Sequence, residues 1–149
     1  MSDYPDKATG GCHCGAIRYT VTQTPEYVAV CHCESCRKTT GAPAVVYAVY
    51  PDSCVQFLQG SRKVYESSPD INRTFCGDCG TPLSYEAEWQ GERLIGFFIG
   101  TLDEPDLFPP KKHVFHEQRI GWFEISDQLP RYFELPKAGR EPDQIGPVI

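Results

Sequence analysis

Seven of the eight cysteines stand in three short clusters, and these clusters constrain the fold more than any other feature of the sequence. The first cluster is Cys12–Cys14, with one residue between its thiols, and the third is Cys76–Cys79, with two. The second, Cys31–Cys36, holds three thiols. Two thiolates so close on a tight turn can both reach one ion, at about 2.3 Å for zinc. Glycines supply the backbone freedom that such turns need, at Gly15, Gly77 and Gly80.

Seven thiols divide naturally into four plus three. A two-cysteine turn pairs readily with another one, so the first and third clusters suit a closed, structural zinc site whose binding energy is folding energy. The second cluster offers three ligands and an open position, which is the pattern of a catalytic metal. We therefore expect two Zn²⁺ per chain. The predicted ligands are Cys12, Cys14, Cys76 and Cys79 for the structural zinc, and Cys31, Cys33 and Cys36 for the catalytic zinc.

Other interpretations of the clusters stay open at this point. The first and third clusters could instead form disulfides or isolated thiols. The second could be another structural site completed by His32, His113 or His116, or an iron–sulfur cluster, although such clusters usually recruit four cysteines. His13 lies between ligands, as does His32, and both are expected to point away from the metal. Cys54 stands alone and is expected to be a buried strand thiol.

Length and charge narrow the class of protein. The chain has 149 residues and a formal net charge of −6. This length fits a single domain over residues 1–149, with a core from about 11 to 135 and an irregular tail at 137–149. An acidic chain lacks the basic face that a nucleic-acid binder needs.

The sequence also predicts a cytoplasmic protein. No apolar run approaches the ~18–20 residues of a membrane span, and the N-terminus has no basic or apolar segment of a secretory signal. In a reducing cytosol, thiols stay free or bind metal.

Glycines and prolines cut the chain into short pieces that mostly read as strands. Short helices are expected at Glu34–Thr40, ended by Gly41, and at Trp122–Leu129, with Trp122 in the core. The pattern predicts a mainly β fold of short antiparallel strands. The expected strands are Ile17–Val21, Glu26–Val30, Ala44–Tyr50, Val64–Tyr65, Asn72–Phe75, Leu83–Ala87, Leu94–Ile99, Val114–Phe115 and Tyr132–Phe133.

The motifs Gly10–Gly15, Cys31–Arg37 and Phe75–Leu83, in this order, resemble the glutathione-dependent formaldehyde-activating enzyme family, also described as the S-(hydroxymethyl)glutathione synthase-like family. The similarity runs from about Gly11 to Pro130. The segment His116–Trp122 lacks a lysine and a small or proline residue that relatives often carry there, so the substrate can differ from the founding one. Later matches are Pro110–Phe115, Trp122 and Leu129–Pro130.

The resemblance implies a fold similar to the Mss4-like zinc-binding β folds, with a structural and a catalytic zinc on the cysteines assigned above. It implies a zinc-dependent carbon–sulfur lyase that binds glutathione or a similar small thiol at the three-cysteine site. The enzyme would form or break an aldehyde–thiol adduct such as S-hydroxymethylglutathione, with glutathione as co-substrate. The alternative is a non-catalytic carrier of zinc or glutathione. A chromatin or cytoskeletal adaptor is disfavoured, because such relatives rely on basic extensions.

The expected partners are a small-molecule thiol and an aldehyde, with no nucleic acid and no membrane, and a homodimer is the assembly to test. An anionic tripeptide needs local cations and hydrogen-bond donors, and several follow the second cluster directly. Their alternative roles are solvated surface charges and a plain turn. The candidate substrate contacts are Arg37, Lys38, Thr39, Thr40, Gly41 and His113.

Overall fold

The computed structural model describes residues 3–147. Residues 1–2 and 148–149, at the ends of the predicted domain and tail, lie outside the described residues. Short strands dominate, as expected from the sequence, with one α-helix, α1 (Glu34–Thr40), and four short 3₁₀ turns. The strands are β1 Ala8–Gly11, β2 Arg18–Val21, β3 Tyr27–Cys31, β4 Val45–Pro51, β5 Val55–Gln59, β6 Arg62–Ser68, β7 Ile71–Cys76, β8 Pro82–Trp89, β9 Glu92–Phe98, β10 Lys112–Val114, β11 Pro130–Arg131 and β12 Gln144–Ile145. The 3₁₀ turns are η1 Asp52–Cys54, η2 Ile99–Thr101, η3 Pro105–Leu107 and η4 His116–Gln118.

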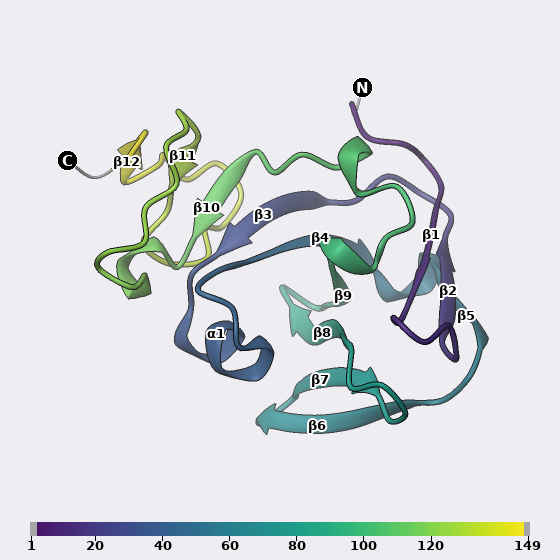
Figure 1. Ribbon diagram of the computed structural model, residues 1–149. Helices are drawn as coiled ribbons and strands as arrows, with labels where there is room; N and C mark the ends of the chain where they lie inside the picture. Colours follow the sequence, from purple (N-terminus) through teal and green to yellow (C-terminus); the bar gives the residue numbers. More distant parts are fainter. Residues whose placement is uncertain (1–2, 148–149) are drawn as a thin grey trace.

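The strands form two sheets (Figure 1). The larger has nine strands in the order β12-β11-β10-β3-β4-β9-β8-β7-β6, and the smaller has the order β1-β2-β5. Most neighbours are antiparallel, which confirms the predicted mainly β fold, but β10 runs parallel to both β3 and β11. The short return strand β10 thereby places the segment after it beside the end of β3.

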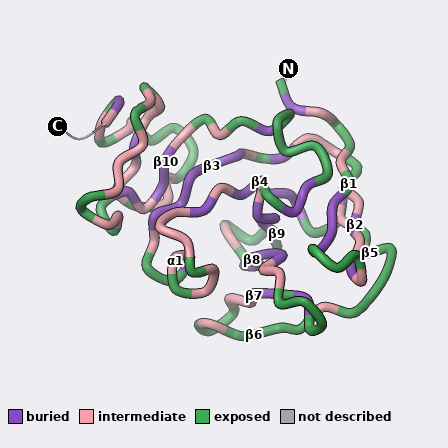
Figure 2. The backbone as a smooth tube through the Cα atoms, viewed as in Figure 1, coloured by how far each residue is buried: buried purple, intermediate pink, exposed green. Residues whose placement is uncertain are grey.

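Strand β4 lies near the middle of the larger sheet and is buried on both faces. Successive side chains of a strand point to opposite sides, so β4 contributes to two cores. Val45, Tyr47 and Val49 enter one core, and Ala48 and Tyr50 enter the other. Figure 2 shows the buried stretches running along β3 and β4, whereas β6 at the sheet edge is largely exposed. The two cores therefore share one central strand.

The first core fills the space between the two sheets. The ring of Tyr19 from β2 stacks on the ring of Phe97 from β9, with centroids 3.7 Å apart. The second core lies on the other face of the larger sheet, where Cys31 and Cys36 pack with Tyr47 and Val114. The second cysteine cluster is thus part of a hydrophobic core.

Helix α1 forms where the sequence predicts it. The sulfur of Cys33 caps its N-terminus by accepting a hydrogen bond from the backbone N–H of Cys36 at 3.2 Å. Gly41 ends it in the left-handed conformation at φ 74°, which costs glycine nothing.

Strands β1, β5 and β12 are absent from the expected set, and the strand expected at Tyr132–Phe133 is not formed there but just before it, as β11. The sequence of β1 ends in Gly10–Gly11, which has little intrinsic strand propensity. A Cβ on Gly10 would collide with the carbonyl of Thr101 and the ring of Tyr19, so the close approach of η2 to β1 selects glycine. The glycines of β1 are therefore explained by this tertiary contact and not by the local sequence.

The prediction of a helix at Trp122–Leu129 is wrong. The segment instead wraps around the fully buried guanidinium of Arg131, which donates to the carbonyls of Ile125 and Leu129, both at 2.7 Å. The same guanidinium pairs with the carboxylates of Glu124 at 3.1 Å and Asp127 at 2.5 Å. In this segment, backbone carbonyls accept hydrogen bonds from the Arg131 guanidinium in place of the backbone hydrogen bonds of a helix. Trp122 is also not in the core, since its side chain is 78% exposed.

The predicted tail at 137–149 is mostly irregular where it is described. Its exception is β12, which pairs with β11. No helix among residues 3–147 has the length and apolar character to cross a membrane.

Candidate active site and metal-ligating cysteines

The first and third cysteine clusters meet, although they lie far apart in the sequence. The Sγ atoms of Cys12, Cys14, Cys76 and Cys79 all lie within 4.8 Å of one another. The Cys12–Cys14 and Cys14–Cys76 sulfur distances are 3.6 and 3.8 Å. A tetrahedral zinc with 2.3 Å bonds separates its sulfurs by about 3.8 Å, so this donor set fits zinc.

In both turns that carry this four-cysteine cluster, a cysteine sulfur accepts a backbone N–H. The sulfur of Cys12 accepts the backbone N–H of Ile17 at 3.2 Å, and that of Cys76 accepts the N–H of Asp78 at 3.4 Å. One turn follows β1 of the smaller sheet and the other follows β7 of the larger sheet. The cluster therefore links the two sheets.

The eight cysteines are all free thiols. The sulfur distances exceed the ~2.05 Å of a disulfide by far, so the disulfide interpretation has no support in the geometry. Cys54 is buried and donates to the carbonyl of Pro51 at 3.1 Å, away from both clusters.

The second cluster forms a separate three-cysteine site. The Sγ atoms of Cys31, Cys33 and Cys36 lie within 4.8 Å of one another, with 3.6 Å between Cys31 and Cys36. Cys31 ends β3, Cys33 is the N-cap of α1 and Cys36 lies in the first turn of that helix. Hydrogen bonds from Cys31 and Cys36 lower the pKa of Cys33, while bonds within the cluster raise the pKa of Cys31. Three thiolates together therefore need a cation, and the spacing fits a zinc ion with one open position.

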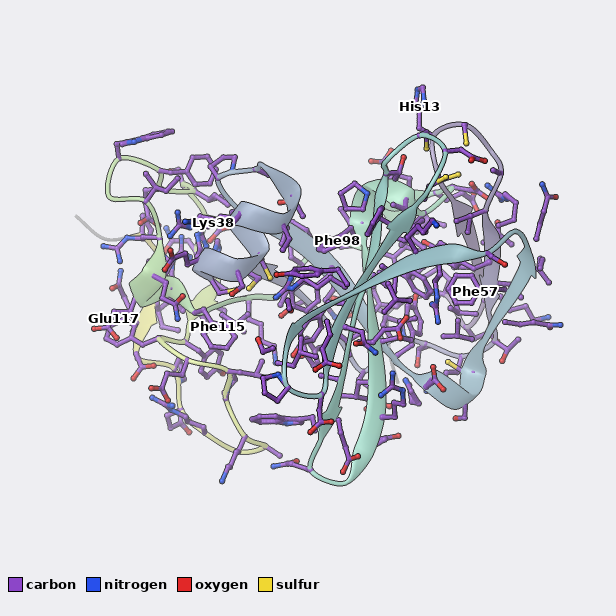
Figure 3. All side chains as sticks on the ribbon, turned by 90° about the horizontal axis from the view of Figure 1, so that it is seen from below. His13, Lys38, Phe57, Phe98, Phe115 and Glu117 are labelled. Atoms are coloured by element: carbon purple, nitrogen blue, oxygen red, sulfur yellow. The ribbon has the colours of Figure 1, made fainter. Side chains whose placement is uncertain are left out.

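Figure 3 shows the sulfur atoms of the four-cysteine cluster and of the three-cysteine site in two separate groups. One group lies at the tip that carries His13, whose side chain points away from the protein, and the other lies beneath α1, the helix that carries Lys38.

The three-cysteine site opens onto a cavity of about 220 Å³, and all three of its cysteines line that cavity. Aromatic and aliphatic side chains make most of the remaining wall. Burial raises the pKa of Tyr27, Tyr47 and Tyr85, so their hydroxyls stay neutral hydrogen-bond donors at physiological pH. The lining outside the cysteines consists of Tyr27, Ser35, Tyr47, Val49, Ser68, Ile71, Arg73, Tyr85, Ala87, Trp89, Leu94, Phe115, Gln118 and Leu135.

Arg73 of β7 brings a positive charge to this site. It is 7% exposed, and its Nη1 lies 3.4 Å from both the Cys36 sulfur and the Thr39 hydroxyl oxygen. Its Nε donates to Ser67 at 3.2 Å, and its guanidinium lies over the ring of Tyr85. A cation held this way offsets thiolate charge. Arg73 is not among the predicted site residues, because no local pattern sets it apart from other strand arginines.

None of the six predicted substrate contacts lines the cavity. Arg37 donates to the backbone carbonyls of His32 and Gln118, and Lys38 pairs with Glu34 on the surface. His113 is fully buried. Thr39, Thr40 and Gly41 form the end of α1, with both hydroxyls bonded to helix carbonyls. A role of these residues in substrate binding stays a prediction.

The histidines that could have completed the three-cysteine site form a buried network instead. His32 Nε2 lies 2.8 Å from His113 Nδ1, and His113 Nε2 lies 3.0 Å from a carboxylate oxygen of Asp127. His116 packs edge-on against His32. Burial lowers the pKa of all three histidines, which keeps them neutral. The network ties the ligand-bearing segment at Cys31–Cys33 to the loop around Arg131.

Comparisons with known proteins agree with this arrangement. The glutathione-dependent formaldehyde-activating enzyme family model matches residues 7–118. A Halomonas elongata protein named "Putative glutathione-dependent formaldehyde-activating enzyme" is 28% identical over 129 residues, 80% of this chain and 81% of that protein. An uncharacterized lyase of Schizosaccharomyces pombe is 32% identical over 76 residues, 51% of this chain and 55% of that protein.

The fold also has a counterpart among solved structures. A crystal structure of a Rhodobacter sphaeroides protein superposes with a TM-score of 0.51 at 23% identity, covering 64% of this chain and 87% of that one. The antiparallel sheets, the four-cysteine cluster and the three-cysteine site are those expected of an Mss4-like fold. Since the family model covers most of the sequence, the chain belongs to the glutathione-dependent formaldehyde-activating enzyme family.

Proposed function

We propose that the protein is a zinc-dependent carbon–sulfur lyase that joins a small thiol, such as glutathione, to an aldehyde, or splits the adduct. The observation that carries this proposal is the three-cysteine site in the wall of the 220 Å³ cavity, where a metal ligand set meets space for a substrate. The family name supports glutathione and formaldehyde as the founding pair. A second zinc, on Cys12, Cys14, Cys76 and Cys79, has a structural role in this proposal.

The proposed reaction moves one proton and no net electrons. A carbon–sulfur bond forms between the thiol sulfur and the carbonyl carbon, and the thiol proton passes to the carbonyl oxygen. A zinc ion held by Cys31, Cys33 and Cys36 would lower the pKa of a substrate thiol so that it reacts as the thiolate.

The residues around the site assist this chemistry in three ways. The neutral hydroxyls of Tyr47 and Tyr85 can donate to the oxygen on which negative charge develops. The apolar wall excludes water, which strengthens these hydrogen bonds. Arg73 offsets the charge of the thiolates. We place the protein in the cytoplasm, where reducing conditions keep its cysteines out of disulfides.

The test is to follow adduct formation from glutathione and formaldehyde by exchange NMR at catalytic and stoichiometric protein concentrations. Catalysis accelerates the reaction many-fold beyond the buffer rate at a small fraction of the substrate concentration. Saturation at one equivalent without turnover would instead identify a carrier.

Arg73→Met is expected to lower the zinc affinity of the three-cysteine site by about 10- to 100-fold, as for other groups that hydrogen-bond to metal ligands. The bond lost is the one from Nη1 to the Cys36 sulfur. Titration against a chromophoric chelator measures the affinity. Arg93→Met is the matched control, because Arg93 pairs with Glu86 on the neighbouring strand. Equal affinities in the two variants would contradict the role of Arg73.

A further inference from the structure

The cavity beside the three-cysteine site is too large for the aldehyde that gives the family its name. Its volume is about 220 Å³, whereas a one-carbon aldehyde is little larger than a water molecule, which occupies about 30 Å³ in the liquid. An enzyme that served only this aldehyde would leave most of the space without a contact. The cavity therefore indicates a larger group next to the reacting carbon.

The chemistry of the wall excludes the charged parts of a tripeptide thiol from this space. Among the described residues that line it, Arg73 carries the one formal charge outside the cysteines. That charge is already committed to the Cys36 sulfur and to the hydroxyls of Ser67 and Thr39. Burying a carboxylate or an ammonium against apolar walls without a partner is costly.

The same wall suits a flat apolar ring. Tyr27, Tyr47 and Trp89 offer ring faces and edges, and Leu94 and Leu135 offer aliphatic surface. Aromatic groups pack against one another in stacked or edge-on geometries that add to the gain from burying apolar area.

We infer that the carbonyl substrate carries a bulky apolar substituent, of which a phenyl ring is the best fit, and that this cavity holds it beside the three-cysteine site. The inference rests on the proposed function. The carbonyl carbon then lies toward the cysteines and the charged ends of the thiol lie outside the cavity. The bond made is the same carbon–sulfur bond, with the thiol proton passing to the carbonyl oxygen.

The experiment compares acetaldehyde with phenylacetaldehyde, each with glutathione, as kcat/KM divided by the uncatalysed rate constant in the same buffer. Burial of a phenyl group predicts a preference of roughly 10- to 150-fold for phenylacetaldehyde. Equal acceleration of the two aldehydes would overturn the inference. So would a preference that resides in the thiol, seen as faster reaction of formaldehyde with 2-phenylethanethiol than with glutathione.

Two variants that fill the cavity test where the preference arises. Ile71 and Leu135 line the cavity and are both partly exposed, so a larger side chain at either position intrudes on the cavity from its rim. Ile71→Trp and Leu135→Trp are expected to erase the preference. Val64→Trp, on the exposed surface of β6, is the matched control and should keep it. A preference that survives in both cavity variants would contradict the assignment.

Binding of an unreactive analogue separates this inference from the proposed reaction. Calorimetric titration of 2-phenylethanol should show binding that Ile71→Trp abolishes and that ethanol does not reproduce. If no aldehyde is turned over but 2-phenylethanol still binds, the proposed reaction fails and the apolar site stands. If 2-phenylethanol does not bind, the apolar site fails, whatever the activity with formaldehyde.

Discussion

Cys76→Ser is expected to lower the free energy of unfolding by at least about 5 kcal/mol, which is comparable to the whole stability of a domain of this size. The cluster that contains Cys76 links β1 of the smaller sheet to β7 of the larger sheet. Because an unfolded chain holds no such cluster, the free energy of metal binding there is folding free energy. Cys76 is 1% exposed and its sulfur accepts backbone N–H groups, so a serine at this position would weaken the junction between the two sheets.

Denaturant unfolding monitored by circular dichroism, together with zinc content, measures this effect. Cys54→Ser is the matched control, because Cys54 is also buried but belongs to neither cluster, and a serine hydroxyl can keep its bond to the Pro51 carbonyl. We expect that control to retain both ions and to lose about 1 kcal/mol or less. If Cys76→Ser unfolded at the wild-type midpoint with two ions bound, the structural role of the four-cysteine cluster would be refuted.

Cys36→Ser is expected to remain folded, to lose one zinc ion of two, and to lose about 1,000-fold in kcat/KM for adduct formation. A metal that activates a nucleophile is worth several kcal/mol in the transition state, and each 1.4 kcal/mol is a factor of ten. The site spans only Cys31–Cys36, from the end of β3 to the first turn of α1, so it joins no strands that lie far apart in the sequence.

Metal analysis, circular dichroism and single-turnover kinetics of the same sample distinguish this result from unfolding. Cys54→Ser again serves as the control and should keep full activity. A folding defect in Cys36→Ser as severe as that in Cys76→Ser would mean that both sites are structural.

The sequence predicts those parts of the site whose residues are close together along the chain. The spacing of the cysteines separates four thiols from three, and the geometry groups the same residues. Helix α1 was predictable because its start and its end, at Gly41, are both local signals. Helix α1 and the grouping within each cysteine cluster depend on neighbours within a few positions, whereas the pairing of Cys12–Cys14 with Cys76–Cys79 was inferred from the number of thiols in each cluster.

Features that depend on distant partners were missed. Arg73 approaches Cys36 from another strand, and nothing near it in the sequence marks it. The segment at 122–129 has helical composition, but Arg131 recruits its carbonyls and carboxylates. The glycines of β1 are typical of a loop, and the close approach of Thr101 and Tyr19 to Gly10 explains why glycine stands in a strand there.

The two cysteine sites differ in the order in which a growing chain can complete them. Cys31, Cys33 and Cys36 leave the ribosome almost together, so this site needs the closure of only a very short loop. Cys14 and Cys76 are 62 residues apart, and their meeting requires β7 to be made and folded against the turn after β1. During synthesis Cys12 and Cys14 therefore lack their partner cysteines at a stage when all the cysteines of the three-cysteine site are already present. The slow, non-local step of folding is the same step that assembles the four-cysteine cluster.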